Sequence, residues 1–175
     1  MFGTLHETDD GRWQVRFERH LPHAPEKVWR AISEPEHLAA WFPSTIEGDR
    51  VAGAPLRFDF DTPGVEPIQG EMIAFEAPRL MELAWGEDIL RFELTPDGDG
   101  TLLVFSDTIV ERGKVARDAA GWHECLARFD HALAGEPVPF DDGAVWREVN
   151  AQYQERFGPE ASTVGPPAGH PMHDA

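Results

Sequence analysis

Apolar and polar positions alternate along much of the chain between residues 12 and 109, and this alternation predicts a β-sheet. A period of two is typical of half-buried strands. The predicted strands, about six in number, are residues 12–18, 56–61, 70–75, 80–85, 90–94 and 101–109. The turn residues of Pro96-Asp97-Gly98-Asp99-Gly100 join the last two strands as a hairpin.

Two helical regions flank these strands. Residues 25–42 predict two short helices, because Pro35 interrupts an otherwise helical pattern. From Val115 to Leu133, apolar residues recur at intervals of three and four, which predicts one long amphipathic helix that ends at Gly135. A second apolar stripe, from Trp146 to Phe157, predicts an appended helix.

Helices on both sides of a run of strands predict an α+β fold in which a curved antiparallel sheet wraps around the long C-terminal helix. We expect one domain over residues 1–135, an appended amphipathic helix over residues 136–158, and a disordered tail over residues 159–175, which are rich in Gly, Pro and Ala. A helix does not cover a strongly twisted sheet evenly, so a tapered space is expected between them.

Composition narrows the classes of partner. The chain has 175 residues, with 15 basic and 32 acidic side chains and a formal net charge of −17. This charge disfavours nucleic acid and anionic membranes as partners. The sequence has no apolar run long enough to insert into a membrane and no secretory signal, so we expect a cytoplasmic protein in which Cys125 is a buried, reduced thiol.

The sequence offers little support for metal or nucleotide chemistry. His123 and Glu124 begin a zinc-protease motif, but Ala127 stands where the second histidine is required. The Asp-rich turn before Gly100 resembles a calcium loop, yet Thr108 occupies the position of the bidentate glutamate. A Gly-rich phosphate loop and a nucleophile elbow are both absent. We therefore expect neither a metal nor a cofactor.

Three separated motifs resemble a known family. Residues 25–42, PEKVWRAISEPEHLAAWF, resemble the signature of the START/Bet v 1-like (SRPBCC) superfamily, and more narrowly the branch named after the activator of Hsp90 ATPase. Residues 70–85 resemble the strand–turn–strand pattern of that branch, and Gly121-Trp122 with Leu133-Ala134-Gly135 resemble its last helix. The resemblance implies a helix-grip fold, often with an apolar cavity, in proteins that carry or transform lipids, polyketides and other hydrophobic molecules.

The leading hypothesis is a non-enzymatic module that encloses a hydrophobic, lipid-like or polyketide-like molecule between the sheet and the long helix. A tightly filled core is the alternative explanation for the same aromatic residues. The candidate ligand-binding residues are Trp41, Phe42, Phe58, Phe60, Trp85, Phe92, Trp122, Leu126 and Phe129. Trp41 and Phe42 are expected at the mouth of such a pocket.

Two further hypotheses remain open. One is an enzyme of the polyketide cyclase or hydratase type, in which His123 is the candidate catalytic residue and a strand carboxylate (Glu71, Glu82 or Asp107) faces inward beside it. The other is a stress-related, co-chaperone-like protein-interaction module, in which residues 144–157 form a homodimer or bind a partner.

Overall fold

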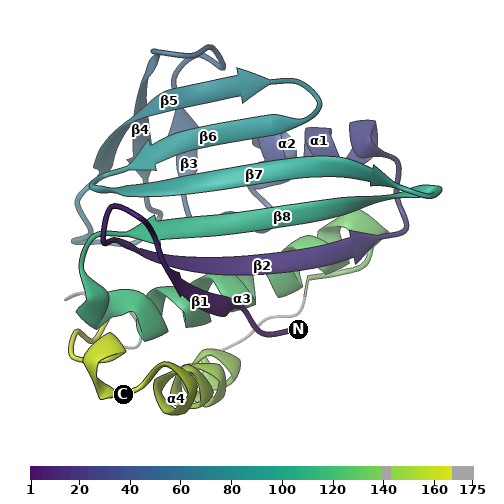
Figure 1. Cartoon of the computed structure of the whole chain (residues 1–175). Helices are drawn as coiled ribbons and strands as arrows, with labels where there is room; N and C mark the ends of the chain where they lie inside the picture. The colour runs from purple at the N-terminus through teal and green to yellow at the C-terminus, as the bar shows by residue number, and fades with distance from the viewer. Residues whose placement is uncertain (139–142, 167–175) are drawn as a thin grey trace.

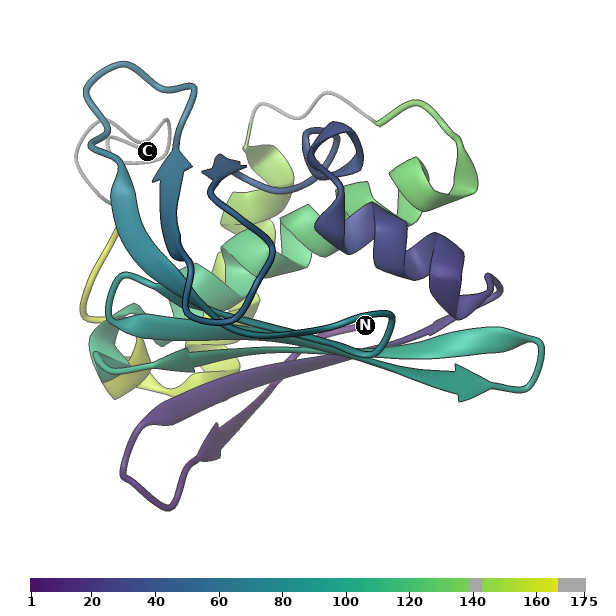
Figure 2. The same cartoon turned by 90° about the horizontal axis from the view of Figure 1, so that it is seen from above.

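Eight antiparallel strands form one twisted sheet, and a 20-residue helix, α3, lies across its concave face (Figures 1 and 2). The structure is a computed structural model that describes residues 1–138 and 143–166. The strand order across the sheet is β1-β2-β8-β7-β6-β5-β4-β3. The strands are β1 (Thr4–Glu7), β2 (Trp13–Leu21), β3 (Thr45–Glu47), β4 (Pro55–Asp59), β5 (Ile68–Glu76), β6 (Leu80–Trp85), β7 (Asp88–Asp97) and β8 (Gly100–Ile109).

The helices follow the predicted order. They are α1 (Pro25–Ser33), α2 (Pro35–Leu38), α3 (Val115–Ala134) and α4 (Ala144–Phe157), with short 3-10 turns at η1 (Arg112–Lys114) and η2 (Pro159–Ala161). The α+β helix-grip prediction is therefore confirmed, as is the helix that follows the long one. Within the described ranges, no helix has both the length and the apolar character needed to cross a membrane.

The β7–β8 hairpin sets which side chains face α3. Gly98 adopts a left-handed conformation with φ of 58° in the tight turn, a conformation that glycine enters without a steric penalty. The register then pairs Leu94 with Leu103, Phe92 with Phe105 and Leu90 with Asp107. All six side chains are buried. Asp107 therefore lies in a row of core-facing residues that are otherwise apolar.

The long helix buries one stripe against the sheet. Its buried residues include Ala119, Trp122, Leu126, Phe129 and Leu133, the stripe that the periodicity predicts. At the C-terminal end of α3, α1 and α2 cover the remaining part of the sheet (Figure 2).

The appended helix α4 docks on α3 within the same chain (Figure 1). Trp146, Val149 and Tyr153 form its buried face. The fully buried Tyr153 hydroxyl accepts a hydrogen bond of 2.8 Å from the backbone N–H of Gly3. A homodimer through residues 144–157 would therefore have to use the opposite, exposed face of α4.

Two parts of the fold differ from the sequence prediction. The short strands β1 and β3 were not predicted. Residues 159–166, predicted as part of a disordered tail over 159–175, instead return to η1, where the N–H of Val164 donates to the carbonyl of Gly113 at 3.0 Å. A Cβ at Gly113 would lie 2.2 Å from the Thr163 hydroxyl oxygen, so any larger residue there would force this contact to shift. Residues 167–175 lie outside the described part of the chain.

Candidate functional site

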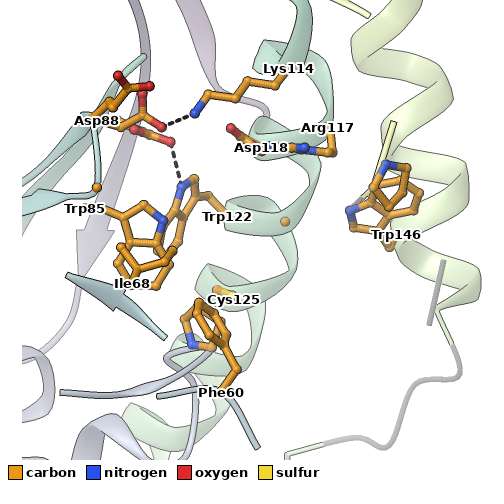
Figure 3. A pocket seen from close by; sticks show the side chains of 16 residues that line it. Phe60, Ile68, Trp85, Asp88, Lys114, Arg117, Asp118, Trp122, Cys125 and Trp146 are labelled. Atoms are coloured by element: carbon orange, nitrogen blue, oxygen red, sulfur yellow. Dashed lines mark hydrogen bonds and ion pairs between the residues drawn. The ribbon is translucent and has the colours of Figure 1, made fainter. Parts of the chain in front are cut away.

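A cavity of about 400 Å³ opens between the N-terminal half of α3 and the turn that joins β6 to β7 (Figure 3). Its walls come from several separate segments of the chain. The lining residues are Pro43, Phe60, Ile68, Trp85, Gly86, Glu87, Asp88, Asp107, Lys114, Arg117, Asp118, Gly121, Trp122, Cys125, Trp146 and Pro166. The cavity is thus assembled by the tertiary fold rather than by one local motif.

Helical spacing explains why one end of this cavity is charged. Lys114, immediately before α3, is followed at intervals of four by Asp118 and Trp122, so these side chains lie one above another on the helix. Arg117, Gly121 and Cys125 form a second row with the same spacing. Both rows line the cavity.

Aromatic rings form the apolar wall. The ring centroid of Trp85 lies 6.0 Å from that of Trp122 and 5.7 Å from that of Phe60. Gly121 leaves room beside this wall, since a Cβ built on it would meet no heavy atom of the described residues within 4 Å, apart from the neighbouring backbone of its own helix. Glycine in a helix interior costs about 1 kcal/mol relative to alanine, so the open space at Gly121 is obtained at the expense of stability.

Two acid–cation pairs lie at the polar end. The ammonium of Lys114 reaches the Oδ2 of the buried Asp88 (Figure 3). The Oδ1 of Asp88 accepts a hydrogen bond of 3.1 Å from the N–H of Val110. Burial lowers the pKa of Lys114, but the bond to Asp88 and the surrounding carboxyl groups outweigh it and the pKa is raised. The Nε of Arg117 donates to the Oδ1 of Asp118 at 2.6 Å.

Asp107 lacks such a cation. It is only 2% exposed, and its Oδ2 accepts a hydrogen bond of 2.9 Å from the indole Nε1 of Trp122. Its Oδ1 is buried and has no hydrogen-bond partner in residues 1–138 and 143–166. Burial, and then the nearby Asp118 and Asp88, raise the pKa of Asp107 well above its usual range. These surroundings favour the protonated, neutral carboxyl.

The comparison with known families identifies the fold family. A sequence model described as activator of Hsp90 ATPase homolog 1-like protein matches residues 22–134. The chain belongs to this family. Its membership confirms the resemblance to the activator branch of the START/Bet v 1-like superfamily. None of the curated proteins matches the chain.

Several solved structures have the same fold as this family member over most of its length. CalU16 from Micromonospora echinospora is 20% identical with a TM-score of 0.69, covering 89% of this chain and 92% of CalU16. A conserved protein of unknown function from Enterococcus faecalis is 23% identical with a TM-score of 0.69, and the match covers 88% of this chain and 89% of the Enterococcus chain. DynU16, from the dynemicin biosynthetic locus, is 26% identical with a TM-score of 0.64, covering 73% of this chain and 50% of DynU16.

Three of the nine predicted ligand-binding residues line the cavity of this Hsp90-activator-like domain. They are Phe60, Trp85 and Trp122. The other six residues, Trp41, Phe42, Phe58, Phe92, Leu126 and Phe129, are buried in the hydrophobic core.

Trp41 and Phe42, expected at a mouth, are instead 2% and 6% exposed. The Trp41 ring lies 5.1 Å from that of Phe129, and its indole N–H donates to the carbonyl of Ala31. Phe42 packs behind the cavity wall, with its ring centroid 5.6 Å from those of both Trp85 and Trp122. Trp41 instead borders a second, smaller hollow of about 280 Å³ beside α1 and α2.

His123 does not line the cavity. A helix turns about 100° per residue, so His123 points away from its neighbour Trp122 and toward α4. Its Nδ1 lies 3.2 Å from the Tyr153 hydroxyl, and its ring centroid is 4.9 Å from that of Phe2. Burial, followed by the positive charges of the N-terminus, Arg19 and Arg156, lowers the pKa of His123 to about 4.

The three strand carboxylates considered as its partner are dispersed. Glu71 is exposed, and Glu82 forms an ion pair with Arg91. Only Asp107 lines the cavity. The structure thus does not bring His123 and a strand carboxylate together at the cavity.

Most polar residues of the site are not among the candidates that the sequence pattern suggests. Lys114, Arg117, Asp118 and Asp88 line the cavity but are not among the residues singled out from the sequence. The spacing of four between Lys114, Asp118 and Trp122 was the available signal, because it places charges directly in line with a core-facing tryptophan. Glu34, which precedes α2, and Glu36 and His37 on α2 bring three potential metal-ligand atoms within 4.8 Å of one another. The position is largely exposed, and exposed acidic groups are common without a metal.

Proposed function

We propose that this protein is a non-enzymatic carrier or sensor that binds a hydrophobic small molecule in the cavity beside α3. The observation that carries the proposal is a space of about 400 Å³ with an aromatic wall and a few polar groups gathered at one end. Ligand sites in proteins commonly have volumes of about 300–1,000 Å³ and this division of apolar and polar lining.

Apolar burial would supply most of the affinity. Phe60, Ile68, Trp85 and Trp122 present apolar surface to the space, and burial of apolar surface contributes about 25 cal/mol per Å². A ligand that loses about 200 Å² of apolar surface to water would gain about 5 kcal/mol before the costs of association. Flat aromatic molecules suit the wall, since indole and phenyl rings favour offset or edge contacts with other rings.

The similarity to DynU16 supports a ligand of biosynthetic origin. DynU16 is a protein of the dynemicin biosynthetic locus, and its likeness covers 73% of this chain. Native mass spectrometry of the freshly purified protein tests the proposal directly. We expect a species heavier than the chain mass, from which organic extraction releases a hydrophobic compound.

A cavity-filling variant gives a second test that does not depend on a co-purified compound. Gly121→Leu places an isobutyl group in open space on the cavity wall, whereas Ala127→Leu places the same group on the exposed face of α3 and serves as the matched control. Equilibrium dialysis against 2-ethylnaphthalene should show binding to the wild type and to Ala127→Leu, and at least a tenfold loss in Gly121→Leu. Circular dichroism verifies that both variants fold. Equal binding in all three proteins, or none in the wild type, would overturn the proposal.

The enzyme alternative gains no support in its original form, because His123 is held by Tyr153 outside the cavity. The protein-interaction alternative has to use surfaces other than the buried face of α4. Sedimentation of the full chain and of a chain ending at residue 135 separates the two roles of α4. A docked helix predicts a monomer before truncation and loss of stability after it, whereas an interface helix predicts a dimer that truncation dissociates.

A further inference from the structure

Asp107 occupies a position where the fold otherwise places apolar side chains. Its register partners are Val15 on β2 and Leu90 on β7, both fully buried. Along β8, the side chains two residues before and after it are Phe105 and Ile109, which are also buried. An aspartate in such a row is costly unless its polar atoms are used.

Among the described residues that line the cavity, Asp107 is the buried acid that forms no ion pair with a cation. Among the described lining residues, Lys114 pairs with Asp88 and Arg117 pairs with Asp118, while Glu87 is exposed to solvent. Within each pair, the positive charge of the cation balances the negative charge of the carboxylate. A third buried carboxylate would have no counterion, so charge balance favours a neutral Asp107.

Hydrogen bonding then places the proton. The Oδ2 of Asp107 accepts a hydrogen bond from the Trp122 indole N–H. In a neutral carboxyl group the carbonyl oxygen is the better acceptor, so Oδ2 is the carbonyl oxygen. The hydroxyl is therefore Oδ1, the atom that has no partner among the described residues. A buried hydroxyl without an acceptor is unfavourable, because its desolvation is not offset by a hydrogen bond. A ligand that supplies an acceptor would remove this free-energy cost and so bind more tightly.

We propose that the protonated Asp107 donates a hydrogen bond to a carbonyl oxygen of the ligand, so that the cavity selects neutral aromatic ketones over hydrocarbons, acids and amines of the same size. This inference rests on the proposed small-molecule function and specifies its ligand class. The aromatic portion would lie against Trp85 and Trp122, and the carbonyl would point toward the sheet at Asp107.

The same geometry disfavours an anionic ligand. Lys114 and Arg117 are the cations that line the cavity within the described ranges, and each already has a carboxylate partner. A ligand carboxylate would have to displace Asp88 or Asp118, leaving one of them without its cation. Fatty acids and aromatic acids are therefore poor candidates.

Four probes of matched size test this selection by equilibrium dialysis at pH 7. They share a naphthalene ring and carry an acetyl, ethyl, carboxylate or 1-aminoethyl group at position 2. We expect the wild type to bind 2-acetylnaphthalene about tenfold more tightly than 2-ethylnaphthalene, the gain expected for one hydrogen bond to an otherwise unpaired buried donor. We expect 2-naphthoate and the protonated amine to bind more weakly than the ketone.

Two variants assign the preference to one atom. Asp107→Leu removes the donor and should reduce the ketone preference to within about twofold of unity. Asp107→Asn keeps an acceptor for the Trp122 indole and offers an amide N–H in place of the hydroxyl, so it should retain the preference. If Asp107 were ionised, the wild type would show no ketone preference and Asp107→Asn would create one. Far-ultraviolet circular dichroism confirms folding, and the wild-type ranking of the four probes stands even if Asp107→Leu fails to fold.

The outcomes separate this inference from the function on which it rests. Equal binding of the ketone and the hydrocarbon, both lost in Gly121→Leu, would leave the cavity function intact and overturn the role of Asp107. Tightest binding of the amine would overturn it too, because it would show that Asp107 acts as a carboxylate. Absence of binding by all four probes would count against the proposed function itself.

Discussion

Acidification from pH 7.5 toward pH 5 should weaken the fold through His123, and the structure allows the size of the effect to be worked out. In the fold, Tyr153 accepts a hydrogen bond from the N–H of Gly3 and lies 3.2 Å from the Nδ1 of His123. The simplest complete arrangement has the Tyr153 hydroxyl donating to an unprotonated Nδ1. A proton on Nδ1 would leave that hydroxyl without its acceptor.

The sign of the effect follows from the two pKa values of His123. The pKa is 6.5 for an ordinary histidine and about 4 in the fold, where burial is the largest cause and nearby positive charges add to it. Between these values, the unfolded chain binds a proton that the folded chain excludes. The free energy of unfolding therefore decreases as the pH falls through this window.

A pKa difference of about 2.5 corresponds to about 3.4 kcal/mol when the pH lies below both values, at 1.36 kcal/mol for each pKa unit. The sequence pI is about 4.7, so solubility favours a measurement at pH 5.3. The proton linkage at that pH amounts to about 1.6 kcal/mol. Water screens a ring that is only partly buried, which leaves an expected loss of about 1 kcal/mol.

Urea unfolding of the wild type and of His123→Asn at pH 7.5 and pH 5.3 isolates this contribution. Carboxyl groups titrate in the same range, so the quantity of interest is the difference between the two proteins in their change with pH. We expect the variant to lose about 1 kcal/mol less than the wild type on acidification. An NMR titration of the folded protein provides the direct control, and a His123 pKa near 6.5 would refute the reasoning.

Three substitutions and one rate of thiol modification test other parts of the structure. Gly121→Ala should raise the free energy of unfolding by about 0.5–1 kcal/mol in urea, because alanine is the better helix former and its methyl group enters open space; destabilisation would show that the space is not open. Tyr153→Phe should lower the free energy of unfolding by about 1–2 kcal/mol by leaving a buried backbone N–H without an acceptor, and an unchanged urea midpoint would contradict this. Lys114→Met should cost about 3 kcal/mol, since it strands the buried carboxylate of Asp88, and a cost below 1 kcal/mol would mean that the pair contributes little. The surroundings of the partly buried Cys125, desolvation first, raise the pKa of its thiol to about 12, so a thiol reagent at pH 8 should modify the native chain at least about 100-fold more slowly than the urea-unfolded chain; similar rates would contradict the raised pKa.

The parts of the fold that the sequence predicted are those governed by local pattern. The long helix was predicted from its apolar stripe, and its end from Gly135, which adopts the left-handed conformation with φ of 73° that closes α3. The two missed strands, β1 and β3, span four and three residues. Strands of this length have too few positions to show alternation, and they exist because a neighbouring strand pairs with them.

The candidate site was harder to predict, because periodicity identifies an apolar face and does not show where along that face the packing is incomplete. Trp122 and Phe129 belong to the same stripe, yet only Trp122 borders the cavity. The difference comes from what faces each residue. Trp41 packs against Phe129 from α2's end, whereas the small residue Gly121 leaves room beside Trp122.

The contrast between His123 and Asp107 shows which sequence signal carried more information. His123 attracted interest through its residue type, but its angular position one residue after Trp122 directs it toward α4. The facing of Asp107 is ambiguous from the sequence, because both alternating sets of residues in its strand contain apolar residues. In the structure, Ser106 and Thr108 on the other face of β8 are buried as well. Counting residues outward from the hairpin turn removes that ambiguity, since pairing Asp97 with Gly100 necessarily pairs Leu90 with Asp107. A carboxyl group that the register places among core residues needs a proton, a cation or a ligand to offset its burial. Strand register therefore points to Asp107 more strongly than residue type points to His123.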